Sequence, residues 1–464
     1  MQAERRVPPE VPGGRLTGSI RDLLRDQLGT YTAALRHGDV VTMRVGPPRL
    51  GTSSCLVFHP DGVQHVLASA ARTYLKKDPV YTELRLWFGD GLLTDEGPRW
   101  QARRRTVQPL FTARQVAAFD APMLAEVQAL LQRWDTHART GEPVDLHADM
   151  TALTLYVVSR VLLGGEADET LESIAATYPV LNRHVLRRIA SLVRLPHQVP
   201  LPGNVRAHAA KARLFGSARE VVRRRTARRD GRREGPVSPP GGDLLDRLLA
   251  ARDPETGAGL SEEELVSQVV TFLLAGQETS AIALTAALHL LAQHPEAQER
   301  LHDEAAAVLA GRAPQAADVP QLPLAAHVFY EALRLYPPAW ASARRAETDD
   351  AVCGYRVDEG TMVVISQWVT QRDPRWWEEP ERFLPGRWVG DQSAERHRYA
   401  WFPFGGGPRA CIGRHFALQE AVLVLSAIVQ RFRLSPVTPA LNVQAGVTLQ
   451  PREAVLAGVE ARGL

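Results

Sequence analysis

The chain has 464 residues, of which 23% are charged and 45% are hydrophobic, a composition typical of soluble globular proteins. Its 55 basic and 52 acidic residues leave a formal charge of only +3, which argues against a nucleic-acid-binding domain. The three cysteines are too few for a disulfide framework, so we expect a reducing, cytoplasmic location.

The N-terminal end carries no recognisable targeting signal. Residues 1–16 lack the apolar core of a secretory peptide, and we expect them to form a flexible segment. No stretch approaches the roughly 18 uninterrupted apolar residues of a membrane span. The remainder, 17–464, is expected to form a single domain, in which the Pro-, Gly- and Arg-rich stretch 231–242 is an exposed loop.

Helical periodicity dominates the first half of the chain. Amphipathic stretches predict four helices, over about 18–35, 115–137, 146–163 and 204–229. Two runs with a Gly- and Pro-rich turn between them predict β-strands, over 40–45 and 53–58. The pattern therefore indicates a mainly helical protein with a minor β component.

The most regular element begins at Ser261. Ser261 and Glu264 form a capping box, and apolar periodicity continues from there until Pro295 ends it. A helix over 262–293 would span about 48 Å, which is enough to cross a whole domain. A second strong helix is predicted over 414–430, after a region of mixed short strands and turns.

The sharpest local feature is the stretch FPFGGGPRACIGRHF at 402–416. Its glycines allow the backbone to approach a bulky group closely, and Cys411, directly before a helix, should have a lowered thiol pKa. Such a thiolate is a nucleophile or a soft metal ligand, but the only local base, His415, could face away from it. No second cysteine lies at a zinc or iron–sulfur spacing. One thiolate as the only protein ligand indicates haem, with a structural cysteine as the alternative.

The same stretch resembles the cysteine loop of the cytochrome P450 family, the haem-thiolate monooxygenases. Phe404, Gly407, Arg409, Cys411 and Gly413 match the family pattern F-x-x-G-x-R-x-C-x-G at every fixed position. The resemblance implies that they form the haem-binding loop, with Cys411 as the proximal iron ligand and Phe404 near the sulfur. It also implies a single-domain, mainly α cytochrome P450 fold, with haem b (iron protoporphyrin IX) between the long helix and the helix after this loop.

A second motif, AGQETS at 275–280, lies in the middle of the long helix. Its glycine, acid and hydroxyls are unfavourable in a buried helix, so they form either a solvated patch or a functional site. In the cytochrome P450 family, this segment lies over the distal face of the haem. The resemblance implies that Gly276 opens a groove for dioxygen, that Thr279 hydrogen bonds to the oxygen, and that Glu278 relays protons.

Glu331 and Arg334 have the i, i+3 spacing of an ion pair on one helix face, which means little by itself when the pair is exposed. In the family, an arginine from a later segment completes this pair, here Arg382 in the sequence PERF. The resemblance implies a buried network of Glu331, Arg334 and Arg382 beneath the cysteine loop, as structural support rather than catalysis.

Further side chains are assigned by the resemblance to the haem propionates. They are Trp100, Arg104, Arg344 and Arg409. Arginine suits this task because its guanidinium group matches a carboxylate in bidentate geometry.

In the family, variable segments line the substrate pocket and form the substrate walls. In this chain, we assign the substrate walls to apolar side chains, each of which could instead be an ordinary core residue. They are Leu86, Trp87, Phe88, Phe272, Ala275, Trp340, Ala341 and Val447. Their apolar character implies a lipophilic substrate. The segments after Arg334 look more like lipid- and terpenoid-oxidising bacterial members of the family, so we expect a terpenoid or a fatty acid.

The source of electrons follows from the length of the chain. The part after Cys411 is too short for a flavin reductase domain, so we expect a separate ferredoxin and ferredoxin reductase. A basic patch on the cysteine side would suit an acidic ferredoxin, and we expect it to include Arg103, Arg105 and Arg414.

The chain is thus expected to be an oxidoreductase of bacterial secondary metabolism that inserts one oxygen atom from O₂ into its substrate, by hydroxylation or epoxidation. One alternative is a peroxide-driven peroxygenase or isomerase, although such members of the family usually lack an acid–alcohol pair like Glu278 and Thr279. The other is a catalytically silent haem or ligand carrier, which does not need that pair.

Overall fold

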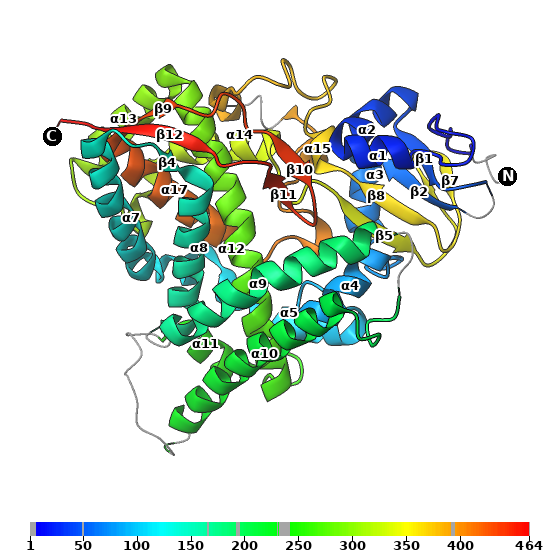
Figure 1. The fold of residues 1–464 in the computed structure, drawn as a ribbon, viewed down its shortest axis with the longest axis horizontal. Helices are drawn as coiled ribbons and strands as arrows, with labels where there is room; N and C mark the ends of the chain where they lie inside the picture. Colours follow the sequence, from blue (N-terminus) through cyan, green and yellow to red (C-terminus); the bar gives the residue numbers. More distant parts are fainter. Residues whose placement is uncertain are drawn as a thin grey trace.

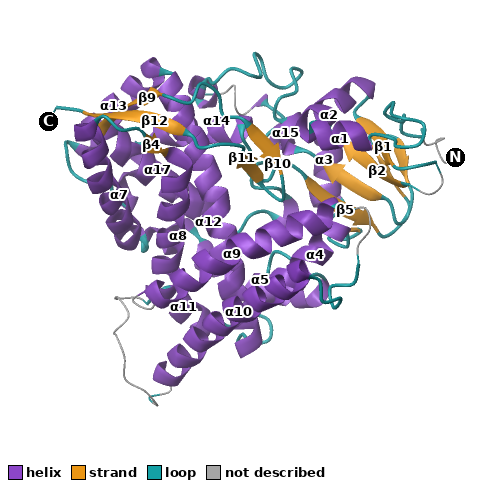
Figure 2. Ribbon diagram, viewed as in Figure 1, coloured by secondary structure: helices purple, strands orange, loops and turns teal. Residues whose placement is uncertain are grey.

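The computed structural model describes residues 6–48, 51–164, 167–191, 195–229, 231, 242–390 and 395–463. A body of long helices and a smaller β-rich part lie side by side, and the N-terminal residues belong to the β-rich part (Figures 1 and 2). The expected mainly α fold with a minor β region is confirmed.

The helices of the described chain differ widely in length, and the longest ones build the helical body. They are α1 (Ile20–Arg25), α2 (Gln27–Ala34), α3 (Pro60–Gln64), α4 (Pro79–Phe88), α5 (Gly97–Val107), α6 (Ala113–Ala117), α7 (Asp120–Thr140), α8 (Leu146–Leu163), α9 (Ala167–Ala190), α10 (Pro202–Arg229), α11 (Leu244–Ala250), α12 (Glu262–Gln293), α13 (Pro295–Leu309), α14 (Pro323–Leu335), α15 (Gln367–Thr370) and α17 (Arg414–Arg431).

Helix α12 passes through the middle of the helical body and contacts α8, α10, α14 and α17 (Figure 1). It begins as the sequence predicts, because Ser261 Oγ accepts from the Glu264 N–H at 3.3 Å and Glu264 Oε2 accepts from the Ser261 N–H at 3.0 Å. It ends at the C-cap residue His294, and Pro295 starts α13. Most of its side chains are buried, so α12 is the core helix against which the rest of the body packs.

Two described helices, α8 and α12, are long and apolar enough to span a membrane by length and composition alone. Within the fold, 56% and 72% of their most apolar windows are buried, as in core helices. They pack against each other, and Thr154 of α8 donates to the Gln277 carbonyl oxygen of α12 at 2.9 Å.

Three predicted helices form with small shifts of their ends, namely those over 146–163, 204–229 and 414–430. The prediction over 115–137 begins at the end of α6 and continues, after a break, as α7. The stretch 18–35 instead forms two helices, because Asp26 is extended with φ −155° and its side chain caps α2 by accepting from the Gly29 N–H at 3.0 Å. Helix α9 has no counterpart among the predicted segments. It contains Pro179, a residue that disfavours a helix interior, and packing against α8 and α10 compensates for this.

The β-rich part holds the largest sheet, with strand order β1-β2-β8-β5-β3, in which β2 and β8 run parallel and the other pairs antiparallel. The predicted strands over 40–45 and 53–58 are its β1 and β2. The strands of the described chain are β1 (Val40–Val45), β2 (Thr52–Val57), β3 (Tyr74–Leu75), β4 (Val144–Asp145), β5 (Ser342–Ala346), β6 (Asp350–Val352), β7 (Tyr355–Val357), β8 (Met362–Ile365), β9 (Phe432–Pro436), β10 (Val443–Ala445), β11 (Leu449–Pro451) and β12 (Leu456–Ala461).

The N-terminal segment differs from its prediction in the part that the structure describes. Residues 1–5 lie outside the described residues, but the next ones pair with the sheet. The Val11 N–H donates to the Thr42 carbonyl oxygen at 2.8 Å, and the Thr42 N–H donates to the Pro9 carbonyl oxygen at 2.8 Å. Val11 is also buried. These hydrogen bonds hold this part of the expected flexible segment against β1.

The chain on both sides of the predicted loop 231–242 belongs to one body. Most of the loop, 232–241, lies outside the described residues. Arg225, before it, makes a buried ion pair with Asp243, after it, at 2.7 Å. One hydrophobic cluster also extends along the chain from Leu84 to Val459. A single domain is therefore the unit that positions the site.

Candidate active site

The cysteine loop is shaped by a close backbone approach at Gly407. Gly407 has φ +62°, and a Cβ added to it would lie 1.9 Å from the Leu67 carbonyl oxygen, so only glycine fits there. The Cys411 N–H then donates to the Phe404 carbonyl oxygen at 2.8 Å, which closes the loop directly before α17. The motif residues of the sequence prediction thus come together in one turn.

Three groups favour the ionised form of the Cys411 thiol, and one larger effect acts against it. The Gly413 N–H hydrogen bonds to the sulfur, and the positive charges of Arg104 and Arg414 act in the same direction. Cys411 has some solvent-exposed surface, but protein atoms surround it at a larger distance. This burial is the largest effect on the pKa of its thiol. The pKa of the thiol is therefore raised, and the expected lowering is wrong for the protein by itself.

On α12, the side chains of Ala275, Glu278 and Thr279 share one helix face, because their spacing is i, i+3 and i+4. Ala275 is exposed although it lies in the middle of the core helix. The Thr279 hydroxyl donates to the Ala275 carbonyl oxygen at 2.7 Å. This open face therefore presents an alcohol and an acid beside a small apolar residue.

Gly276 lies against α8, which the sequence analysis does not expect. A Cβ at Gly276 would lie 3.0 Å from a methyl group of Val158 on α8. The glycine therefore lets α8 pack closely against α12, and a groove for dioxygen at this residue stays a prediction.

Three basic side chains from distant segments lie close enough to repel one another: Lys76 and Arg344, which are buried, and Arg409, which is half-buried. Burial, followed by the charges of the two arginines, lowers the pKa of Lys76 well below its usual value. Lys76 donates to the Leu93 carbonyl oxygen at 2.9 Å, and Arg409 makes an ion pair with Glu96. The sequence analysis missed Lys76, although lysine is rare in this arginine-rich chain.

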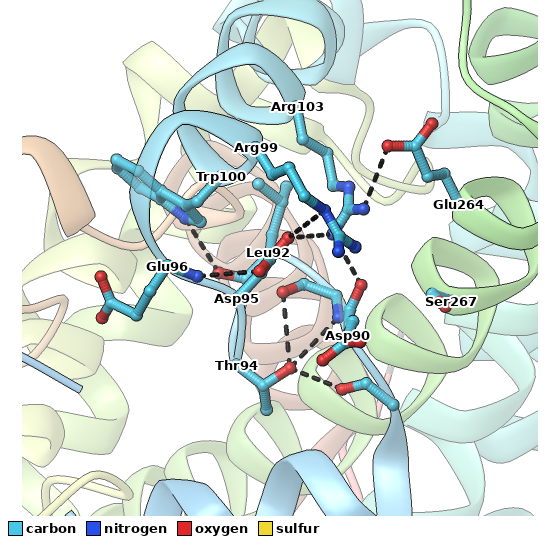
Figure 3. Close-up of polar contacts among 12 residues, drawn as sticks. Asp90, Leu92, Thr94, Asp95, Glu96, Arg99, Trp100, Arg103, Glu264 and Ser267 are labelled. Atoms are coloured by element: carbon cyan, nitrogen blue, oxygen red, sulfur yellow. Dashed lines mark hydrogen bonds and ion pairs between the residues drawn. The ribbon is translucent and has the colours of Figure 1, made fainter. Parts of the chain in front are cut away.

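Trp100 and Arg409 stack against each other beside this cation cluster. The guanidinium carbon of Arg409 lies 3.9 Å from the centre of the Trp100 ring. The indole N–H of Trp100 donates to the Leu92 carbonyl oxygen at 3.1 Å (Figure 3). Arg104 takes another direction, because it donates to the Ala410 carbonyl oxygen of the cysteine loop at 3.1 Å.

This group of side chains fits a haem. A haem presents an iron, which suits the Cys411 thiolate, and two propionates, which suit an excess of positive charge. Arg344, Arg409 and Lys76 supply that excess. In addition, Arg409 Nη1 is buried without a hydrogen-bond partner among the described residues.

The predicted support network forms with a different third member. Arg334 donates to Glu331 through two hydrogen bonds of 2.8 and 2.9 Å, and both side chains are fully buried. Arg387, rather than Arg382, completes it, because Arg387 Nε donates to Glu331 Oε1 at 3.0 Å. The Arg382 side chain is 63% exposed and pairs with Glu379. Arg382 contributes only its carbonyl oxygen, which accepts from Arg334 at 3.0 Å.

The network reaches the cysteine loop through one glutamine. Arg334 Nη1 donates to the Gln371 carbonyl oxygen at 3.1 Å. The Gln371 side chain in turn accepts from the Phe402 N–H at 3.0 Å. This chain of hydrogen bonds joins α14 to the first residues of the loop that carries Cys411.

The expected basic patch for a ferredoxin is corrected by the structure. The Arg103 side chain is only 1% exposed and pairs with Asp95 at 2.9 Å and with Glu264 at 3.1 Å (Figure 3). Arg105 pairs with Asp253 at 3.0 Å. Arg103 is therefore used inside the fold, whereas the Arg105 side chain is still 33% exposed beside its acidic partner and Arg414 is exposed.

Three of the predicted substrate-wall residues are buried in the core, and their contact with a substrate stays a prediction. Trp87 is fully buried, and its ring centre lies 4.6 Å from that of His184. Phe272 is buried against Phe111, with ring centres 5.1 Å apart. Trp340 is buried as well, and its indole N–H donates to the Gly446 carbonyl oxygen at 2.9 Å. The others, which are less buried, remain predictions: Leu86, Phe88, Ala275, Ala341 and Val447.

Comparison with known proteins identifies the family. A model of the cytochrome P450 family matches residues 15–456. The cyclooctat-9-en-7-ol 5-monooxygenase of Streptomyces melanosporofaciens is 35% identical over 432 residues, which cover 93% of this chain and 89% of that protein. The pentalenene oxygenase of Streptomyces avermitilis is 32% identical, covering 94% of this chain and 92% of that protein. The crystal structure of the cytochrome P450DA heme domain, 29% identical, superimposes with a TM-score of 0.86 and covers 99% of both chains.

The chain therefore belongs to the cytochrome P450 family. It is a cytochrome P450 monooxygenase, and it binds haem with an axial cysteine thiolate. Cys411 is that ligand, because it stands at the cysteine position of the family loop and its loop has the geometry described above.

Proposed function

We propose that this monooxygenase inserts one atom of O₂ into a terpenoid, by hydroxylation or epoxidation. The observation that carries the proposal is the open face of α12, where the Thr279 hydroxyl and the Glu278 carboxylate stand beside Ala275. An acid and an alcohol next to an apolar surface suit a lipophilic substrate whose oxidation consumes protons. Bacterial relatives named cyclooctatin synthase and pentalenene oxygenase support the terpenoid class.

When bound, the haem supplies the activation of dioxygen at its iron. In this proposal, Thr279 holds a proton at its Oγ1 for delivery next to the iron. To do so, its hydroxyl must leave the Ala275 carbonyl oxygen, to which it donates at 2.7 Å. Glu278, one residue away on the same face, replaces the proton that Thr279 delivers.

Substitution of the alcohol tests these roles. Thr279→Ala should divert most reducing equivalents into hydrogen peroxide, with at least a tenfold lower yield of product per electron pair. Thr285→Ala is the matched control, because Thr285 donates to a carbonyl oxygen four residues earlier at the same 2.7 Å distance but is buried elsewhere on α12. A Thr279→Ala enzyme that still couples its electrons to product would contradict the assigned role.

The terpenoid class is tested by binding. A panel of terpenoids and fatty acids is titrated into the haem-loaded enzyme, and the shift of its Soret band is recorded. Shifts with terpenoids alone support the proposal, whereas shifts with fatty acids alone overturn it. Product formation from peroxide without any reductase would favour the peroxygenase alternative, and no turnover with any electron donor would favour a silent carrier.

The proposal also includes a separate ferredoxin, with its reductase, as electron donor and a cytoplasmic location. Arg414 supports an acidic partner because it is exposed and its charge acts on the Cys411 thiol. Arg414→Glu should slow reduction by ferredoxin at least fivefold at low salt. Arg206→Glu, which changes another exposed arginine, on α10, should not slow it. Equal rates in both variants would remove Arg414 from the docking surface.

A further inference from the structure

Three polar side chains from two other elements, α9 and β11, converge on Glu278 of α12. Asn182 of α9 donates to Glu278 Oε1 at 3.1 Å, and Gln450 of β11 donates to the same oxygen at 2.7 Å. The Tyr178 hydroxyl, one turn before Asn182 on α9, also hydrogen bonds to Glu278. All four residues are half-buried, so the cluster borders on open space rather than the sealed core.

The cluster lies among residues that are apolar. The ring of Phe88, on α4, lies 6.3 Å from the ring of Tyr178. Leu186, one helical turn beyond Asn182, lies beside Gly446 at the tip of the β10–β11 hairpin. A Cβ added to Gly446 would lie 3.4 Å from the Leu186 side chain. Phe88 and the hairpin tip are also where the sequence analysis places the substrate walls. A few polar groups in an otherwise apolar cavity typically fix the orientation of a ligand.

The hydrogen bonds determine which polar atoms remain for a ligand. Gln450 Nε2 donates to Glu278 and also to Thr448 Oγ1 at 3.0 Å, so both of its hydrogens are used. The amide nitrogens of Gln450 and Asn182 thus face Glu278, and their carbonyl oxygens face away from it. Neither Gln450 Oε1 nor Asn182 Oδ1 accepts a hydrogen bond from any residue that the structure describes.

Two free carbonyl oxygens beside a carboxylate can only accept hydrogen bonds. A neutral hydroxyl group would satisfy them, because it donates a proton and brings no charge. A carboxylate would meet the negative charge of Glu278 with only the second amide hydrogen of Asn182 left to compensate, which is unfavourable in a half-buried site. A hydrocarbon would leave both oxygens without water or a partner.

We propose that Asn182 and Gln450, oriented by Glu278, recognise a hydroxyl group of the substrate. The enzyme then oxidises a lipophilic alcohol at a position remote from its existing hydroxyl, and a reaction that installs this hydroxyl must come before it. The inference rests on the proposed terpenoid class and narrows it to terpenoid alcohols.

Binding of matched ligands tests the inference. Farnesol, cedrol and geranylgeraniol, each paired with its O-methyl ether, are titrated into the haem-loaded enzyme while the Soret shift is followed. The ether keeps the carbon skeleton and removes the donated proton. We expect at least one alcohol to bind tenfold or more tightly than its ether, since sites built for a hydroxyl discriminate strongly against analogues that lack it. Palmitate should bind weakly or not at all.

Variants then locate the preference. Gln450→Leu and Asn182→Leu should each bring the alcohol and its ether within threefold of each other and leave ether binding nearly unchanged. Gln444→Leu is the matched control, because Gln444 pairs with Gln450 across the same hairpin but is exposed. An unchanged carbon monoxide spectrum shows in each case that the variant has folded around its haem. Glu278 itself is left intact because it belongs to the proposed proton path.

The outcomes separate this inference from the function on which it rests. If alcohols and ethers bind equally to the wild-type enzyme, the terpenoid class stands and hydroxyl recognition is wrong. If the preference survives in Gln450→Leu and Asn182→Leu, the recognition site is wrongly placed. If no terpenoid shifts the spectrum, both the terpenoid class and this inference fail. If palmitate binds as tightly as an alcohol, the site does not reject a carboxylate and hydroxyl recognition is wrong.

Discussion

Glu420 of α17 provides a direct test of how burial controls charge in this protein. Its side chain is 1% exposed, and burial raises its pKa from 4.5 to about 8, with only the neighbouring Ser280 side chain acting in the opposite direction among the described residues. At neutral pH, Glu420 is therefore mostly protonated in the folded enzyme and ionised in the unfolded chain. We expect Glu420→Gln, which keeps the shape but cannot titrate, to remove a large pH dependence of stability.

The sign follows from proton binding. Between pH 4.5 and 8, the folded state holds a proton that the unfolded state has lost, so the free energy of unfolding falls as the pH rises. Each pH unit costs about 1.4 kcal/mol, which amounts to about 3 kcal/mol at pH 7 relative to pH 4.5. Relative to the wild type, Glu420→Gln should therefore become more stable by about 3 to 4 kcal/mol between pH 5 and pH 8.

The assay is chemical denaturation of the haem-loaded enzyme at several pH values from 5 to 8, for the wild type and for each variant. Glu299→Gln is the control, because Arg462 and Arg433 lower the pKa of Glu299 to about 2. A group with a lowered pKa contributes stability that is lost only as the pH falls below 4.5, so this variant should differ from the wild type by a constant amount over the measured range. A constant difference for Glu420→Gln as well would refute the reasoning.

Three further substitutions test the support and the binding of the haem. Arg387→Ala should lower the free energy of unfolding by about 3 kcal/mol or more, because it breaks a buried ion pair. Arg382→Ala should change the free energy of unfolding by less than about 0.5 kcal/mol, because its side chain is exposed. Denaturant unfolding measures both variants, and equal effects would contradict the assignment of Arg387 to the network. Gly407→Ala should abolish the thiolate-type carbon monoxide band, since the added Cβ would collide with a backbone carbonyl oxygen. Gly405→Ala should keep the band, because Gly405 has a similar φ of +66° but open space around it. A normal band in Gly407→Ala would show that the loop can shift. Lys76→Met should release haem about tenfold faster to a haem-scavenging globin, as expected for the loss of one charge-assisted hydrogen bond from Lys76 to a haem propionate. An unchanged rate of release would place the propionates away from Lys76.

The long helix shows what local sequence rules can predict. Its start depends on the capping box of Ser261 and Glu264, and its end depends on Pro295, all within a few residues of the boundary. Such signals act without the rest of the fold, so both ends were predicted correctly. Helix α9 shows the opposite case, because Pro179 disfavours a helix locally and contacts with α8 and α10 decide the outcome.

The support network lies at the limit of prediction from sequence. Glu331 and Arg334 are three residues apart, and their pairing follows from helix geometry. The third arginine comes from a segment without regular periodicity, in which Arg382 and Arg387 lie only five residues apart. The turn of the backbone there directs Arg387 inward and leaves Arg382 exposed. No local pattern distinguishes the two.

The sequence by itself determined the family and the cysteine ligand and predicted the acid–alcohol pair, because each depends on residues close together in the chain. The tertiary structure alone decided where charges gather. Lys76, Arg344 and Arg409 come from three distant segments, and their mutual repulsion exists only once the fold buries them together. The same holds for Asn182 and Gln450, which lie 96 residues before and 172 residues after Glu278 in the chain. Spacing along the sequence carries no information about such contacts. They form only when helices and strands that are far apart in the chain pack against one another.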